Sequence, residues 1–245
     1  MSPDARTNNM LLMALPQEIR ASLLEMAQRI PFEREQTLLK PGEQLDWVIF
    51  PEGGIGSVTV ASLDGNEVEV GIVGREGMMG LSAALGVDVM PMRAFVQVGQ
   101  STGLRVPTTA VRAAMDDPAA RAVFHAYTYY QLVHASYSIL SNAHHRIEAR
   151  LARWLLMCHD RVPGDDIHLT HEFMAVMVAA QRTGVTVALH VLEGAHLIRA
   201  RRGVVTIRNR EGLAELAGLS YGKPEAEYAR LIAPFAKPVE QLQEA

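Results

Sequence analysis

Residues 169–209 read LTHEFMAVMVAAQRTGVTVALHVLEGAHLIRARRGVVTIRN, and this stretch decides the fold. Two helical patterns of apolar residues are separated by a short run of small residues, and a ribbon that carries three arginines follows directly. This order is typical of a winged helix-turn-helix, whose second helix enters the major groove of DNA. The sequence therefore predicts a DNA-binding unit near the C-terminal end.

The first predicted helix of this unit begins after Thr170, an N-cap residue whose hydroxyl can accept a backbone N–H from the first turn. Glu172 lies in that first turn, where the helix dipole favours negative charge. The apolar residues that follow lie at helical spacing and predict one buried face, which consists of Phe173, Met174, Met177 and Val178.

The second predicted helix begins near Arg182 or Thr183 and ends at about Glu193. Its core face consists of Val185, Ala188, Leu189 and Leu192. The other face carries side chains suited to base edges and phosphates, and these are Gln181, Arg182, Thr183, Thr186 and His190. Gly184 inside this helix costs about 1 kcal/mol relative to alanine. The presence of Gly184 is explained either by a close approach of this helix to the DNA backbone or by chance.

Alternating residues on both sides of Arg202-Gly203 predict a hairpin, the wing. Its arginines, Arg199, Arg201 and Arg202, are expected to contact phosphates and not bases. The alternative is a solvated basic hairpin on an ordinary α+β domain.

Charge is distributed unevenly along the 245 residues, although the net charge is −4. Residues 1–144 contain 10 basic and 15 acidic side chains, whereas residues 145–210 contain 10 arginines and 6 acids. The positive charge is therefore concentrated where the motif lies, and DNA affinity should depend strongly on salt.

Several function classes are not expected. The single cysteine, Cys158, excludes an intrachain disulfide and is interpreted as a packing residue.

Without a long apolar run or a signal peptide, we expect a cytoplasmic protein with no membrane partner. The close histidine pairs are too few to ligate a metal, so we expect no metal or cofactor. No catalytic triad, metal motif or phosphate-binding loop indicates an enzyme.

The N-terminal half changes from helix to short strands. A helical pattern runs from Pro16 to Ile30, and from about Phe32 to Pro107 turn residues alternate with apolar runs. The clearest runs are residues 47–50, 55–60, 68–73 and 94–98. Many short strands at regular spacing predict a β-barrel or jelly roll.

A long helix is expected between the two units, because Asp117 and Pro118 are suited to the N-cap and first helical positions. One stripe has a period near 3.5 residues and includes Val123, Tyr127, Tyr130, His134 and Tyr137. Such a stripe pairs with its copy in a dimer, which is the favoured interpretation, or packs on its own barrel. A second helical segment, residues 146–158, then enters the DNA-binding unit.

The chain resembles the Crp–Fnr superfamily of bacterial transcription regulators over roughly residues 10–215. The segments HHRIEARLARWLL, LTHEFMAVMV and TVALHVLEGAHLIRARRGVVTI carry the resemblance together. It implies a sensor barrel of the cyclic-nucleotide-binding type (10–112), a dimerisation helix (113–145), a winged helix-turn-helix (146–215) and a tail (216–245). It also implies that a homodimer binds a two-fold symmetric operator.

The sequence departs from the family's pattern at the positions that bind cyclic AMP in other members. Members that bind cyclic AMP use a Gly-Glu pair for the ribose and an Arg-Ser pair for the phosphate. Here Gly80 aligns with the glycine, Leu81 replaces the glutamate, and Met92-Arg93 replaces Arg-Ser, so we do not expect cyclic AMP. The candidate effector pocket consists of Gly80, Leu81, Ser82, Met92 and Arg93.

The recognition helix also departs from the best-known members. Arg182 retains their first arginine, but Thr183 replaces a glutamate and Val187 replaces a later arginine, so base preference should differ.

The sequence thus predicts a homodimeric, sequence-specific regulator that contacts RNA polymerase if it is an activator. Its barrel either senses an effector other than cyclic AMP or is a structural platform. The alternative is a small-molecule-binding module whose basic wing contacts a protein partner.

Overall fold

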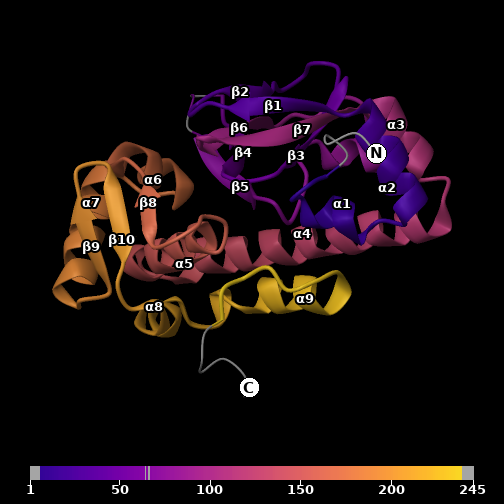
Figure 1. Ribbon diagram of the computed structural model, residues 1–245. Coiled ribbons are helices and arrows are strands. Elements are labelled where there is room, and N and C mark those ends of the chain that lie inside the picture. The colour runs from indigo at the N-terminus through magenta and orange to yellow at the C-terminus, as the bar shows by residue number, and fades with distance from the viewer. Residues whose placement is uncertain (1–5, 64, 66, 239–245) are drawn as a thin grey trace.

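The computed structural model of the chain describes residues 6–63, 65 and 67–238. A β-rich N-terminal unit and a C-terminal unit are connected by the long helix α4 (Pro118–His144), which runs beneath the first and leads to the second (Figure 1). The predicted combination of a β-rich unit, a long helix and a C-terminal helix-turn-helix is confirmed.

Two antiparallel sheets form the N-terminal unit, with strand orders β1–β7–β3 and β2–β6–β4–β5. Their strands are β1 (Gln28–Phe32), β2 (Thr37–Leu39), β3 (Trp47–Pro51), β4 (Ile55–Ala61), β5 (Glu67–Val73), β6 (Arg93–Val98) and β7 (Ser101–Pro107). The four clearest runs predicted as strands form β3, β4, β5 and β6.

The two sheets do not close into a barrel, so that part of the prediction is corrected, whereas a jelly roll is compatible with the arrangement. Side chains from both sheets, including Phe50 of β3 and Val96 of β6, meet in one core without hydrogen bonds joining all the sheet edges. The predicted N-terminal helix is also too long, because α2 (Gln17–Met26) ends early and Ile30 pairs with Gly103 in the sheet. The short helices α1 (Met10–Ala14), η2 (Leu81–Leu85) and α3 (Thr108–Ala114) complete this unit.

Asp117 is the N-cap of α4, as predicted, and its side chain accepts a hydrogen bond from the Ala120 N–H at 2.8 Å. The C-terminal unit then begins with α5 (Ile147–His159). Its remaining elements are β8 (Asp166–His168), α6 (His171–Met177), α7 (Arg182–Gly194), β9 (Ile198–Arg201), β10 (Val204–Ile207) and α8 (Arg210–Ala217).

No single helix in the described ranges is long and apolar enough to cross a membrane. Helices α6 and α7 meet the length and composition criteria only as a pair, which is bent by 101°.

The described part of the segment predicted as a tail, residues 216–238, folds back towards α4. After the short helix η3 (Gly218–Ser220), α9 (Lys223–Leu231) lies along α4 (Figure 1). The ring of Tyr228 on α9 packs edge-on against Tyr130 of α4, with centroids 5.0 Å apart, and its hydroxyl donates to the Glu76 carbonyl at 2.6 Å. Tyr228 and Phe235 therefore belong to the core of the N-terminal unit, whereas Tyr221 packs in the core of the C-terminal unit.

Candidate nucleic-acid interface

Helix α6 begins where the sequence predicts. Thr170 is its N-cap, and the hydroxyl accepts a hydrogen bond from the Phe173 N–H at 3.2 Å. The Phe173 ring packs edge-on against Phe95 of β6, with centroids 5.8 Å apart. Because Phe95 belongs to the N-terminal sheet, α6 is held by both units of the protein.

A tight turn positions the second helix. The bend of 101° between α6 and α7 lies within the roughly 90–120° of helix-turn-helix units. Ala179 in this turn has φ +48°, a left-handed conformation that favours glycine. Helix α7 begins at Arg182, as predicted. A Cβ on Gly184 would lie 2.8 Å from the Ile147 Cδ1 atom, the end of a flexible side chain of α5, so this glycine lies against α5.

The two predicted faces of α7 are separated in the structure. The core face is buried and consists of Val185, Ala188, Leu189 and Leu192. Among the residues predicted to contact DNA, Gln181, Arg182, Thr183 and His190 are exposed. Thr186 is half-buried, and its hydroxyl donates to the Arg182 carbonyl at 3.1 Å and lies 3.1 Å from the His171 Nδ1 atom.

The predicted wing is an antiparallel hairpin of β9 and β10, which turns at Arg202-Gly203 with Gly203 at φ +76°. Its arginines, Arg199, Arg201 and Arg202, are exposed. A third strand, β8, pairs with β10 and was missed in the sequence, because its three residues are too short a run to stand out.

A groove of about 770 Å³ lies between α6, α7 and the wing. It brings together six of the nine predicted DNA-contacting residues, namely Thr170, Arg182, Thr186, His190, Arg201 and Arg202. Gln181, Thr183 and Arg199 lie outside its lining. Within the described part of the chain, none of its three arginines forms a salt bridge. Their guanidinium groups are therefore available to an external anion.

Seven of the residues that line this groove were not predicted to contact DNA, and three of them, His171, Glu193 and Glu35, show how the groove is built. His171 and Glu193 flank predicted contacts, and Glu193 accepts a hydrogen bond from the Ala200 N–H at 3.0 Å, which ties α7 to the wing. Glu35 comes from the β1–β2 connection of the N-terminal unit. No local pattern could have assigned Glu35 to this groove, because only the packing of the two units brings it there.

Four of the five predicted effector-pocket residues line one cavity of about 170 Å³ beside η2. These are Gly80, Leu81, Ser82 and Met92, and the other lining residues are Val58, Val70, Gly71, Val73, Met78, Met79, Met90 and Gln131. Among the residues that the structure describes, no charged side chain lines it. Arg93 lies outside, where it donates to the Thr37 hydroxyl at 3.2 Å and pairs with Glu67 at 3.5 Å.

The stripe predicted as the dimer interface packs within the protomer. Tyr127, Tyr130 and His134 are buried against the sheets, α5 and α9, and Val123 and Tyr137 are half-buried. The Tyr127 hydroxyl accepts from the Met78 N–H at 3.1 Å. Tyr127, Tyr130 and His134 are therefore unavailable for a second copy, so the interpretation that the stripe packs on its own unit replaces the dimer interpretation for these residues.

A different stripe of α4 is exposed. Its members alternate three and four residues apart and are Ala122, His125, Tyr129, Leu132, Ser136, Ile139 and Ala143. Leu132 and Ile139 are 63% and 69% exposed, which is unusual for such large apolar side chains in one row. We call this row the α4 seam.

The fold and the groove together define a winged helix-turn-helix protein. Residues 149–216 match the family model of the Crp-like helix-turn-helix domain. The chain therefore contains a Crp-like helix-turn-helix domain, and over these residues the resemblance to the Crp–Fnr superfamily is confirmed. Comparison with curated proteins finds no match.

Solved structures share the overall fold. FixK2 from Bradyrhizobium japonicum is 17% identical, with a TM-score of 0.68 over 78% of this chain and 98% of its own. The c-di-GMP-responsive regulator CLP from Xanthomonas campestris is 15% identical, with a TM-score of 0.64 over 79% and 99%. A CRP-family regulator from Thermus thermophilus is 22% identical, with a TM-score of 0.63 over 78% and 96%.

Proposed function

We propose that this protein is a sequence-specific transcription regulator that binds double-stranded DNA as a homodimer. The observation that carries the proposal is the groove of α6, α7 and the wing, where arginines without internal salt bridges lie beside hydroxyl and imidazole groups. Arginine pairs bidentately with guanine edges, and wing arginines neutralise phosphates. The same groups on a protein-contact surface would not need this helix-turn-helix geometry.

The α4 seam supports the homodimer. Residues that alternate three and four apart repeat every 3.5 residues on average, the period at which two helices pair along their length. Because the seam is apolar at Tyr129, Leu132 and Ile139, a second copy of the same helix is its natural partner. A two-fold axis along α4 would present two α7 helices to adjacent major grooves, about 34 Å apart.

The cavity beside η2 supports the expectation that cyclic AMP is not the effector. A cyclic nucleotide carries a phosphate charge, which needs a cation or several N–H donors, and none of the described residues places a charged side chain in the lining of this cavity. The same argument applies to c-di-GMP, to which CLP is described as responsive. The N-terminal unit therefore either takes an uncharged effector, with the buried and unpartnered Ser82 hydroxyl as its polar contact, or is a structural platform.

The proposal assigns a role to each segment of the chain. Residues 10–112 form the sensor or platform, 113–145 the dimerisation helix and 146–215 the DNA-binding domain, and α9 packs on α4. A regulator of this kind works in the compartment that holds the DNA, which supports the cytoplasmic assignment. RNA polymerase is a further partner if the protein is an activator.

Selection of DNA fragments by the purified protein, without ligand and at physiological salt, tests the proposal. We expect a palindrome with half-sites about one helical turn apart. If no motif is recovered, the selection is repeated with cell extract, because a motif that emerges only there indicates an obligatory effector. The absence of any motif in both selections would overturn the proposal.

A further inference from the structure

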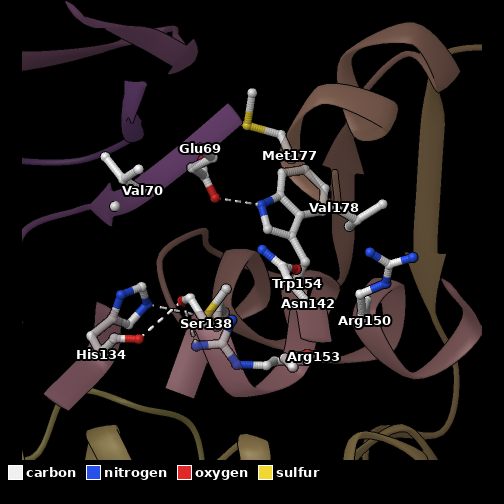
Figure 2. Close-up of a pocket in the computed structure, with 13 residues that line it drawn as sticks. Glu69, Val70, His134, Ser138, Asn142, Arg150, Arg153, Trp154, Met177 and Val178 are labelled. Atoms are coloured by element: carbon white, nitrogen blue, oxygen red, sulfur yellow. Dashed lines mark hydrogen bonds between the residues drawn. The ribbon is translucent and has the colours of Figure 1, made fainter. Parts of the chain in front are cut away.

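A buried carboxyl group connects the two units of the protein. Glu69 lies on β5 of the N-terminal sheet, and its Oε1 atom accepts a hydrogen bond from the Trp154 indole N–H of α5 at 2.9 Å (Figure 2). Its Oε2 atom lies 2.5 Å from the Ser57 hydroxyl of β4. The Ser57 hydroxyl in turn contacts the Met177 sulfur of α6 at 3.4 Å. One carboxyl group thus joins the sheet to the helices that carry the DNA-binding motif.

Two arrangements of protons satisfy the hydrogen bonds around Ser57, one with Glu69 protonated and one with Glu69 ionised. The hydroxyl has one proton but lies against two acceptors, Glu69 Oε2 and, at 2.7 Å, Gln97 Oε1. Both contacts are satisfied when Glu69 carries a proton and donates to Ser57, which then donates to Gln97. When that proton leaves, rotation of the Gln97 amide lets its NH₂ group donate to Ser57, and Ser57 donates to the carboxylate. The same rotation replaces the contact of the Gln97 NH₂ group with the Cys158 sulfur, at 3.6 Å, by a contact of Gln97 Oε1 with the thiol. The site therefore accommodates both states without moving the backbone.

The groups that surround Glu69 come from several elements. Arg153 on α5 and Arg161 just after it are positive, and His134 on α4 is kept neutral because burial holds its imidazole pKa well below the usual range. Burial also raises the pKa of the Cys158 thiol well above its usual value. Arg150 lies across the small pocket in Figure 2. For Glu69 itself, burial outweighs the hydrogen bonds and the two arginines and raises the pKa to about 7.

We propose that Glu69 is a proton-operated latch that holds the DNA-binding unit against the N-terminal sheet most tightly when its carboxyl group is protonated. Trp154 of α5 and Met177 of α6 cover the carboxyl group together with His134 of α4, so separating the units opens one side of its site to water. Deprotonation in the docked state places a charge in this buried site, and the cost is relieved by undocking.

The direction of the pH effect follows from linkage. The pKa of Glu69 is higher in the docked state than its ordinary value of 4.5, so docking gains its full stabilisation below that value and loses it as the pH rises towards about 7. With these two values, the docking equilibrium constant falls about tenfold between pH 6 and pH 8. A group with an unchanged pKa would give no such dependence.

Trp154 provides a direct measurement, because it is buried at the latch and the only other tryptophan, Trp47, can be replaced by Phe. We expect Trp154 fluorescence in the W47F protein to titrate with a midpoint near pH 7, and its quenching by acrylamide to increase from pH 6 to pH 8. The double variant W47F/E69Q retains an uncharged isostere, so both responses should be absent.

A second variant tests the proposal if the E69Q protein folds poorly. Ser57→Ala removes a hydrogen bond that favours the carboxylate, so it should move the fluorescence midpoint to higher pH. A pH-independent W47F signal, a titration that survives E69Q, or a midpoint that S57A leaves unchanged or lowers would overturn the latch. The latch does not depend on the proposed function. None of these measurements involves DNA, so a protein that failed to bind DNA could still have the latch.

Discussion

Arg161 donates a hydrogen bond to Glu76 at 2.9 Å, and neither side chain is exposed to solvent. Arg161 follows α5 at the start of the C-terminal unit, whereas Glu76 follows β5 in the N-terminal unit. Burial works against the charge of Arg161, but the Glu76 carboxylate outweighs it and raises the pKa of the guanidinium group. Arg161 therefore remains charged, and its buried contact with Glu76 fixes the two units against each other.

Glu76→Gln should lower the free energy of unfolding by about 3–5 kcal/mol, because it leaves the buried guanidinium charge without its counter-ion. Urea denaturation measures this change. Glu227→Gln is the matched control, since Glu227 pairs with Arg230 at the surface and its loss should have little effect. The double variant E76Q/R161M should be more stable than E76Q alone, because it removes the orphaned charge. Equal stability of E76Q and the parent protein would contradict the assigned role.

Arg182→Ala should weaken binding to the selected operator by about 1–3 kcal/mol and relax the preference at one base pair of each half-site. Arg202→Ala provides the comparison, because a phosphate contact should weaken binding to all sequences alike and reduce the slope of log K against log salt by about one. Fluorescence anisotropy with operator and scrambled duplexes separates the two effects. An unchanged sequence preference in R182A would remove Arg182 from the base-reading surface.

The DNA-binding unit could be predicted closely from the sequence because its signals are local. The Thr170 cap, the apolar spacing of α7 and the Arg202-Gly203 turn each depend on neighbouring residues. The dimer face could not be assigned in the same way. Both stripes of α4 recur near every 3.5 residues, and only contacts with distant segments decide that the tyrosine stripe is covered, because Tyr127 meets Met78 and Tyr130 meets Tyr228 of α9.

The difference between local signals and distant contacts also explains which residues of the effector pocket were predicted correctly. Gly80, Leu81 and Ser82 are consecutive, so one turn places them together beside the cavity. Arg93 was assigned to the pocket by alignment with a family motif, whereas its direction depends on strand register, and its partners Thr37 and Glu67 lie on other strands. Glu35 in the DNA groove and the contact of Glu69 with Trp154 likewise depend on how the units pack, which no local pattern encodes.

Leu132→Glu should convert the protein to a monomer, because it places like charges directly opposite each other in the centre of the α4 seam. Sedimentation velocity at micromolar concentrations measures the change in mass. Leu219→Glu is the control, since Leu219 is 65% exposed but lies outside the seam. The helix should remain folded, because Leu132 contributes little to the core of the protomer. Dimers that persist in both L132E and an equivalent Ile139→Glu variant would exclude the seam as the interface.

Glu35→Gln should strengthen DNA binding several-fold at low salt. Glu35 reaches the groove from the N-terminal unit, where its negative charge opposes the phosphates that Arg182, Arg201 and Arg202 attract. Because the carboxylate is exposed, salt screens the repulsion, and the gain should shrink as ionic strength rises.

Titrations of operator DNA at two salt concentrations measure this effect, with Glu43→Gln as a surface control outside the groove. A uniform gain at both salt concentrations would indicate that Glu35 acts through the docking of the two units and not through its charge. A loss of affinity would mean that the carboxylate supports DNA binding, for example by orienting a neighbouring arginine, and would contradict the repulsion.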